Sequence, residues 1–130
     1  MDPAFGRILI VDDEPPLLKM MSTYLGRLGY AVTTANSTEK AAGIVEAAPA
    51  DTDIAVLDAT MQGLPMPELA LRMLRANPNL RVLAASGYPV DMSALEAEAP
   101  GRVSFLHKPF TPEMLAAAVR RMLGPQEENV

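Results

Sequence analysis

Hydrophobic residues gather in five short runs along the chain, at residues 7–11, 30–34, 53–57, 81–85 and 103–107. Each run is rich in aliphatic and β-branched side chains and has the length of a β-strand. The first, third and fourth runs are almost continuously apolar, which is typical of strands covered on both faces. The pattern therefore predicts five strands, of which these three are central and parallel.

Apolar residues with helical spacing follow each run, so five helices are expected. The second helix is expected to begin near Asn36, with Glu39 completing a capping box, and a weaker fourth helix covers about 91–97. The other boundary signals are Gly29 after the first helix, Pro49 after the second, Asn77-Pro78 after the third and Thr111-Pro112 before the fifth.

Alternating strands and helices in the order (βα)₅ favour an open parallel sheet with right-handed crossovers rather than a sandwich. A closed barrel would need eight such units. In open sheets of this kind, ligands bind outside the carboxyl ends of the strands. Functional side chains are therefore expected directly after each strand.

Composition narrows the class of protein. A chain of 130 residues with 49% hydrophobic and 5% aromatic residues fits one domain with an aliphatic core. The formal charge of −5 argues against a nucleic-acid-binding face, and the lack of cysteine excludes disulfides and thiolate metal sites. No signal peptide or membrane-length apolar run is present in the sequence, so a cytoplasmic location without membrane contact is expected. The domain is expected at 7–124, with terminal tails at 1–6 and 125–130.

Charged and polar side chains follow four of the five predicted strands. Asp12 and Asp13 come after the first strand, Asp58 after the third, Ser86 after the fourth and Lys108 after the fifth. Taken singly, each has an ordinary structural explanation as a helix cap, a turn residue or a solvated cation. Together they fall where one fold would bring them to the same edge of the sheet, which favours a site. The only histidine, at position 107, has no companion ligands and is expected to be structural or at the surface.

These residue types suit phosphoryl transfer. Three adjacent carboxylates repel one another unless a hard divalent cation such as Mg²⁺ and an amine neutralise them. A carboxylate can serve as a nucleophile and form an aspartyl phosphate, and Asp58 is the best placed to do so. Asp12 and Asp13 would then hold the metal, Lys108 would pair with the phosphoryl oxygens, and Ser86 would donate a hydrogen bond to them.

Four ordered pieces of the sequence resemble the receiver domains of bacterial two-component response regulators, including those of hybrid histidine kinases. The pieces are ILIVDDE at 8–14, AVLD at 55–58, AASG at 84–87 and FLHKPF at 105–110. The resemblance extends from residue 7 to residue 123. It implies an α/β fold with a single (βα)₅ doubly wound parallel sheet, flavodoxin-like, with strand order 2-1-3-4-5.

The resemblance also implies a function and a partner. A histidine kinase or phosphotransfer domain would pass a phosphoryl group to Asp58, with Mg²⁺ or Mn²⁺ held by Asp13, Asp58 and the backbone carbonyl of Thr60. Asp12 would contribute to the metal site mostly through water. Such a domain is a signalling switch rather than a metabolic enzyme, and we expect it to belong to a larger sensor kinase or response regulator.

The switch residues implied by the resemblance are Ser86 and Phe105. Their movement would change the face formed by the fourth helix, the fifth strand and the fifth helix, where an output domain or partner would bind. A phenylalanine at 105 offers no hydroxyl, unlike the tyrosine often found there. The family pattern also implies a cis peptide bond between Lys108 and Pro109.

Three alternatives remain at this stage. A receiver-like module could bind a partner without phosphorylation. A hydrolase of the haloacid dehalogenase type needs a second aspartate two residues after its nucleophile, where this chain has Thr60. A flavodoxin relative would need a phosphate-binding loop after the first strand, which this sequence lacks.

The segment 60–67, rich in proline and methionine, is either the turn that starts the third helix or a partner-contact loop.

Overall fold

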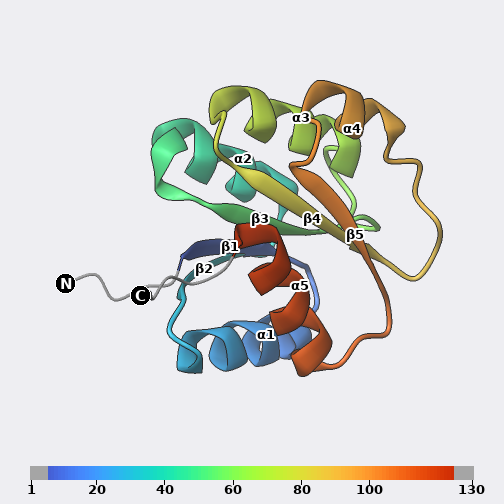
Figure 1. The fold of residues 1–130 in the computed structure, drawn as a ribbon. Coiled ribbons are helices and arrows are strands. Elements are labelled where there is room, and N and C mark those ends of the chain that lie inside the picture. The colour runs from blue at the N-terminus through green and yellow to red at the C-terminus, as the bar shows by residue number, and fades with distance from the viewer. Residues whose placement is uncertain (1–5, 125–130) are drawn as a thin grey trace.

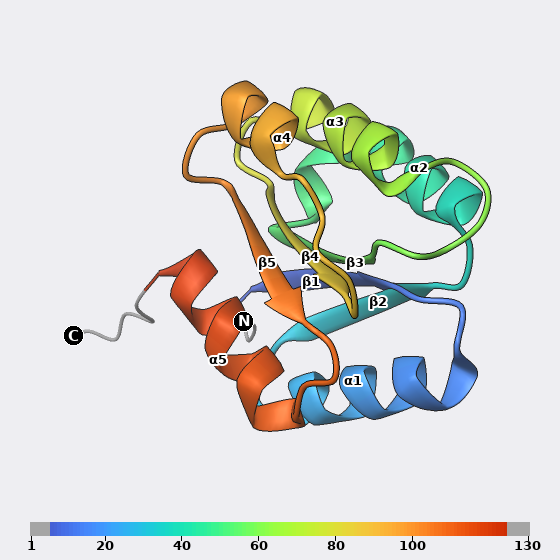
Figure 2. The same ribbon diagram turned by 90° about the vertical axis from the view of Figure 1, so that its right-hand side faces the viewer.

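The computed structural model describes residues 6–124 as one parallel sheet between two layers of helices (Figures 1 and 2). All strand pairs are parallel and the order is 2-1-3-4-5, which confirms the predicted flavodoxin-like topology. The strands are β1 (Arg7–Val11), β2 (Ala31–Ala35), β3 (Ile54–Asp58), β4 (Arg81–Ser86) and β5 (Val103–His107). The helices are α1 (Pro15–Arg27), α2 (Thr38–Ala47), α3 (Met66–Ala76), α4 (Ser93–Glu98) and α5 (Pro112–Leu123), with a 3₁₀ turn at Pro49–Asp51.

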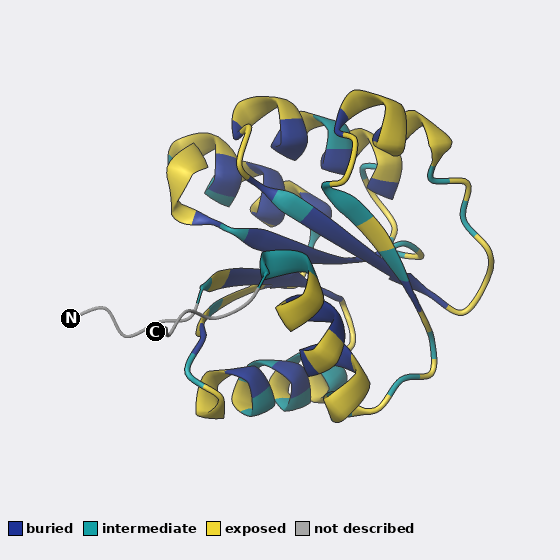
Figure 3. Cartoon of the chain, viewed as in Figure 1, coloured by how far each residue is buried: buried dark blue, intermediate teal, exposed yellow. Residues whose placement is uncertain are grey.

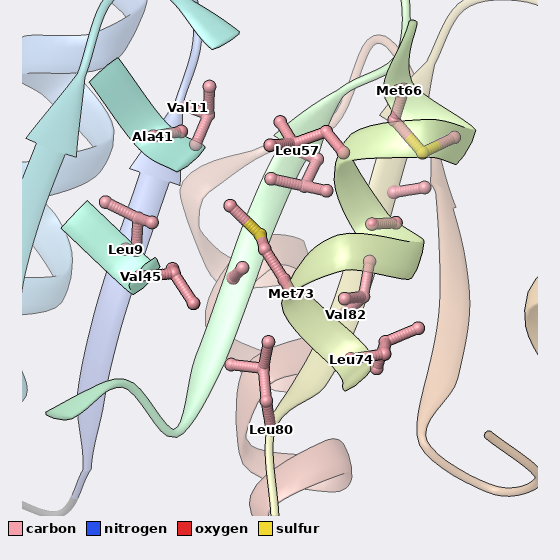
Figure 4. Packing of buried hydrophobic residues seen from close by; sticks show 14 of the residues in the cluster. Leu9, Val11, Ala41, Val45, Leu57, Met66, Met73, Leu74, Leu80 and Val82 are labelled. Atoms are coloured by element: carbon pink, nitrogen blue, oxygen red, sulfur yellow. The ribbon is translucent and has the colours of Figure 1, made fainter. Parts of the chain in front are cut away.

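Each face of the sheet carries its own hydrophobic cluster. Helices α1 and α5 cover one face, while α2, α3 and α4 cover the other (Figure 2). The cluster under α2 and α3 contains the labelled side chains of Figure 4: Leu9, Val11, Ala41, Val45, Leu57, Met66, Met73, Leu74, Leu80 and Val82. Aliphatic and methionine side chains thus build this core, as the low aromatic content predicted.

The central position of β1, β3 and β4 is confirmed by their burial (Figure 3). All five residues of β3 are buried, as are all but the first residue of β1 and of β4. The edge strands β2 and β5 each keep only one fully buried residue. Helices on both faces exclude water from the middle of a parallel sheet, which explains why the central strands lack polar alternation.

Several predicted strand ends were wrong by one residue. Strands β2 and β3 each begin and end one residue later than expected, and β4 extends to Ser86. Asp58 and Ser86 were placed just after their strands, but each is the last residue within its strand. The reason is backbone pairing, because Asp58 still aligns with Ala85 and Ser86 with His107 in the parallel ladder.

Helix α2 begins close to Asn36, as predicted, but the predicted capping box was wrong. The N-cap is Ser37 rather than Asn36, because the extended Ser37 accepts a hydrogen bond from the backbone N–H of Lys40 at 3.1 Å. Glu39 closes no capping box with Asn36. Its carboxylate instead accepts a hydrogen bond from the Thr38 hydroxyl at 3.3 Å.

Most other helix signals were confirmed. Helix α1 ends before Gly29, whose φ of 107° lies in the region that favours glycine. Thr111 caps α5 by accepting from the N–H of Met114 at 3.0 Å, although Met114 itself is exposed and outside the core. The tails predicted at 1–6 and 125–130 lie outside the described residues, apart from Gly6. Within 6–124 no helix has the length and apolar character needed to cross a membrane.

Candidate functional site

The predicted site residues come together at the carboxyl edge of the sheet. Asp12 follows β1, Asp58 ends β3, Ser86 ends β4 and Lys108 follows β5. Backbone hydrogen bonds extend the sheet into these positions: the N–H of Asp12 donates to the carbonyl of Ala35 at 3.2 Å, and the N–H of Lys108 donates to the carbonyl of Ser86 at 2.8 Å. The sheet itself therefore fixes where these side chains start.

Three carboxylates form an acidic cluster at this edge. Asp12, Asp13 and Asp58 each offer one oxygen, and these oxygens lie within 4.8 Å of one another. Asp12 and Asp58 are only 2% and 6% exposed, whereas Asp13 is open to solvent. Carboxylate oxygens with one solvent-facing member match the preference of Mg²⁺ for oxygen ligands and retained water. The residues present therefore fit a hard divalent cation.

The electrostatics of Asp12 also favour a cation. Burial raises the pKa of Asp12 above its usual value, and the nearby charge of Asp58 acts in the same direction. Hydrogen bonds from the N–H of Glu14, at 2.9 Å, and from Lys108 lower this pKa but do not offset burial. The ionised form of Asp12 is thus less favoured here than in water, and a bound cation would favour it.

Lys108 supplies one positive charge to two buried carboxylates. Its Nζ lies 3.5 Å from Oδ2 of Asp12 and 3.6 Å from Oδ2 of Asp58. Both distances exceed those of tight charge-assisted hydrogen bonds, so the ammonium group can still receive an incoming anion. The Lys108–Pro109 peptide bond is cis, as the resemblance implied.

The two oxygens of Asp58 have different environments. Oδ1 accepts hydrogen bonds from the N–H of Thr60 at 3.0 Å and from the Thr60 hydroxyl at 2.8 Å. Oδ2 faces Lys108. The backbone carbonyl of Thr60 was predicted as a metal ligand, but the hydrogen bonds from its N–H and hydroxyl to Asp58 were not predicted. The spacing Asp-x-Thr was a usable signal, because short polar side chains bond to groups two residues away.

Ser86 and Phe105 lie on the neighbouring strands β4 and β5. Ser86 is 1% exposed, and its Oγ accepts from the N–H of Tyr88 at 3.0 Å, so its own proton remains available for donation. Phe105 is half-buried, and its ring centre lies 6.3 Å from that of His107. His107 is exposed, which confirms that it is a surface residue.

An open groove of about 420 Å³ lies beside Lys108. Its walls combine the loop after β5 with the first turn of α1 and are lined by Glu14, Leu17, Gly87, Lys108, Pro109 and Phe110. The side chain of Lys108 keeps 21% of its surface exposed beside this groove. Asp12, Asp13 and Asp58 are not among the lining residues, so the groove adjoins the lysine side of the site.

Relatives of this chain include kinases and transcriptional regulators. The chain is 32% identical to the sensor kinase CckA of Brucella abortus over 120 residues, which cover 92% of this chain and 13% of that protein. It is 32% identical to the phosphate regulon regulator PhoB of Pseudomonas aeruginosa over 128 residues, covering 94% of this chain and 55% of that protein. The chain thus spans only part of the relatives that it matches.

Solved structures agree with the sequence relatives. The receiver domain of the hybrid histidine kinase CckA matches with a TM-score of 0.78 and 29% identity. The match covers 92% of this chain and 100% of that one. A response regulator receiver protein of Sinorhizobium medicae matches with a TM-score of 0.77 and 28% identity, covering 94% and 97%. A sequence profile described as "Response regulator receiver domain" matches residues 8–120. With this fold and this acidic edge, the chain belongs to the family of response regulator receiver domains.

Proposed function

We propose that residues 7–124 form a phosphoacceptor receiver domain that accepts a phosphoryl group on Asp58. The donor would be the phosphohistidine of a histidine kinase or a phosphotransfer domain. An oxygen of Asp58 attacks phosphorus as the phosphorus–nitrogen bond breaks, and the leaving imidazole keeps the electron pair and takes up a proton. The product is an aspartyl phosphate on this chain and an unmodified histidine on the donor.

One observation carries this proposal. The buried carboxylate of Asp58 has one oxygen held by Thr60 and the other facing the ammonium group of Lys108. A fixed carboxylate beside a single amine suits a nucleophile that must accept an anion. Lys108 can then pair with the phosphoryl oxygens, and the buried Ser86 can donate its hydroxyl proton to one of them.

Mg²⁺ or Mn²⁺ would be held by Asp12, Asp13, Asp58 and the backbone carbonyl of Thr60, with Asp12 acting mostly through water. When bound, such an ion neutralises charge on the carboxylates and the phosphoryl oxygens. The oxygen cluster and the raised pKa of Asp12 support this assignment. The protein's own task is to orient Asp58 and to present Lys108 and Ser86.

We further propose that the domain works as a cytoplasmic signalling switch within a larger sensor kinase or response regulator. Ser86 and Phe105 would couple phosphorylation to the face formed by α4, β5 and α5, where an output domain or partner binds. The adjacency of β4 and β5 supports this coupling, because Ser86 and Phe105 lie on neighbouring strands. Neither nucleic acid nor membrane is assigned to this domain as a partner.

The test is Mg²⁺-dependent modification by acetyl phosphate, followed by intact mass. Wild-type protein should gain a single phosphoryl adduct as acetate leaves, whereas Asp58→Asn should gain none. Asp91→Asn is a matched control, because Asp91 is an exposed aspartate outside the cluster. It should be modified like wild type.

An adduct that survives in Asp58→Asn would place the acceptor elsewhere in the chain. A folded wild-type protein that binds Mg²⁺ but gains no adduct from acetyl phosphate or from a phosphorylated histidine kinase would favour the second candidate function. In that case the chain is a receiver-like module that binds its partner without phosphorylation.

A further inference from the structure

A buried hydroxyl at the start of α2 contacts the loop that follows the phosphoacceptor. Thr38 is only 2% exposed, and its Oγ1 accepts a hydrogen bond from the backbone N–H of Leu64 at 3.0 Å. The two residues are 26 positions apart in the sequence. The Thr38 hydroxyl also donates to the Glu39 carboxylate at 3.3 Å, so its proton and one lone pair are both engaged.

The loop approaches Thr38 very closely at Gly63. This glycine has a φ of 96°, and a Cβ at this position would lie 2.7 Å from Oγ1 of Thr38 and 2.8 Å from Oε2 of Glu39. Both features disfavour any residue other than glycine here, since a side chain would force Thr38, Glu39 or the loop to move. Gly63 thus allows the backbone to come near enough for the N–H of Leu64 to reach the hydroxyl.

The same loop is bound at its other end to Asp58. Thr60 donates two hydrogen bonds to Oδ1 of Asp58, and four residues later Leu64 donates to Thr38. Between them, the half-buried Met61 packs against the hydrophobic cluster under α2 and α3. The segment 60–64 therefore has one polar anchor on the acceptor and one on α2.

We infer that Thr38 is a positioning residue for phosphorylation, with Gly63 as the glycine that makes its contact possible. The hydrogen bond from Leu64 to Thr38 holds the loop so that Thr60 keeps the acceptor carboxylate in one orientation. Loss of this bond lets the loop shift and spreads Asp58 over several orientations, which slows a reaction that depends on alignment. This inference rests on the proposed function of Asp58.

Thr38→Val is the informative variant because valine keeps the shape of threonine and removes only the hydroxyl. Two measurements apply to the full chain: the exchange rate of the Leu64 amide hydrogen by NMR, and the initial rate of phosphorylation by acetyl phosphate with saturating Mg²⁺. In Thr38→Val, amide exchange should accelerate about tenfold and phosphorylation should slow about three- to tenfold. Thr38→Ser keeps the hydroxyl and should restore both values to within about twofold of wild type.

Ser37→Ala separates positioning from helix stability. Ser37 caps the same helix through the N–H of Lys40, and its side chain is not the acceptor for Leu64. Loss of the Ser37 hydroxyl destabilises the start of α2. The exchange rate of the Leu64 amide hydrogen and the rate of phosphorylation should stay near their wild-type values. Gly63→Ala is a second disruptive variant, since it displaces the loop from Thr38 and should slow phosphorylation as Thr38→Val does.

The inference is overturned if Thr38→Val loses protection at the Leu64 amide yet is phosphorylated at the wild-type rate. It is also overturned if Ser37→Ala slows the reaction as much, because helix stability would then explain the effect. If Thr38→Val does not fold, a wild-type rate in folded Gly63→Ala overturns it. A wild-type protein that gains no adduct overturns the proposed function itself, which the Asp58→Asn comparison reveals independently.

Discussion

Asp58 and Thr60 are joined by two hydrogen bonds to a single oxygen, because both the N–H and the hydroxyl of Thr60 donate to Oδ1 of Asp58. The first bond depends only on the backbone, while the second needs the side chain. Oδ2 is left to face Lys108. The side chain of Thr60 therefore contributes to the orientation of the Asp58 carboxylate beyond what the turn provides.

Thr60→Val should slow modification by acetyl phosphate, since a hydrogen bond to an ionised carboxylate is lost while the backbone bond remains. We expect a reduction on the order of tenfold in the initial rate. Thr60→Ser retains the hydroxyl and should stay within about twofold of wild type. Equal rates for the valine and serine variants would show that the backbone N–H alone orients Asp58.

Removal of one buried carboxylate should stabilise the protein in the absence of metal. Asp12 lies in a cluster of three acidic side chains and shares the one ammonium group of Lys108 with Asp58, so its buried charge is only partly compensated when no metal ion is bound. Asp12→Asn should raise the free energy of unfolding in chelator by about 1 kcal/mol, measured by urea denaturation. Asp13→Asn should have a smaller effect because Asp13 is exposed.

Added Mg²⁺ should reverse the order of stability, so that wild type has a higher free energy of unfolding than Asp12→Asn. A ligand that binds only the folded state stabilises it by about 2.7 kcal/mol at a concentration 100 times its Kd. Wild type should gain this stabilisation, and Asp12→Asn should gain less at the same Mg²⁺ concentration. If Asp12→Asn is less stable than wild type in chelator, the charge of Asp12 does not destabilise the metal-free protein.

The strand pattern and the chemistry at the strand ends could be predicted because both depend on short stretches of sequence. Continuous apolar runs indicated the buried strands, and parallel topology then brought Asp12, Asp58, Ser86 and Lys108 to one edge. Each of these positions follows from its own strand. The one-residue errors at Asp58 and Ser86 do not change which side chains meet.

Contacts between distant loops could not be predicted in this way. No sequence signal singled out Thr38, because its bond to Leu64 depends on how the loop after β3 returns to α2. Gly63 was visible in the sequence, but its need for a positive φ and for close approach to Thr38 is set by the folded chain. Periodicity reports burial and secondary structure, whereas such pairings follow from the assembled core.

Low pH should reduce the free energy of unfolding, in part through protonation of Asp53. Partial burial raises the pKa of Asp53, but the hydrogen bonds from the side chain and backbone of Arg7 outweigh burial and hold this pKa below its usual value. A lowered folded-state pKa means that the ionised form stabilises the fold. This contribution is present above the unfolded pKa of about 3.9 and is lost as the pH falls through the lower folded value.

Asp53→Asn should therefore lower the free energy of unfolding, and the loss should be largest at neutral pH. The loss should stay below about 1 kcal/mol because the ion pair between Arg7 and Asp53 is partly exposed. The difference in urea midpoint between the two proteins should narrow as the pH falls from 7 to 3. Other carboxylates titrate in both proteins and cancel from the difference. A constant gap across this range would show that the charge of Asp53 is not what stabilises the pair.

Asn77 offers a way to change stability without touching Asp58. Its side chain is buried, and its amide donates to the carbonyls of Pro49 at 2.6 Å and Thr52 at 3.0 Å, which joins the end of α3 to the segment before β3. Asn77→Ala removes both donations and leaves two carbonyls without this partner. The free energy of unfolding should fall by about 2–3 kcal/mol, measured by urea denaturation.

The same variant should be phosphorylated within about twofold of the wild-type rate under conditions where it is folded. The reason is position: Asn77 precedes β4, whereas Ser86 and the acidic cluster lie at the opposite ends of the strands. Asn79→Ala is a matched control at an exposed site and should change stability by less than about 0.5 kcal/mol. If Asn77→Ala slowed phosphorylation as strongly as Thr38→Val, general loosening of the fold would account for both, and the specific role of the loop after β3 would not stand.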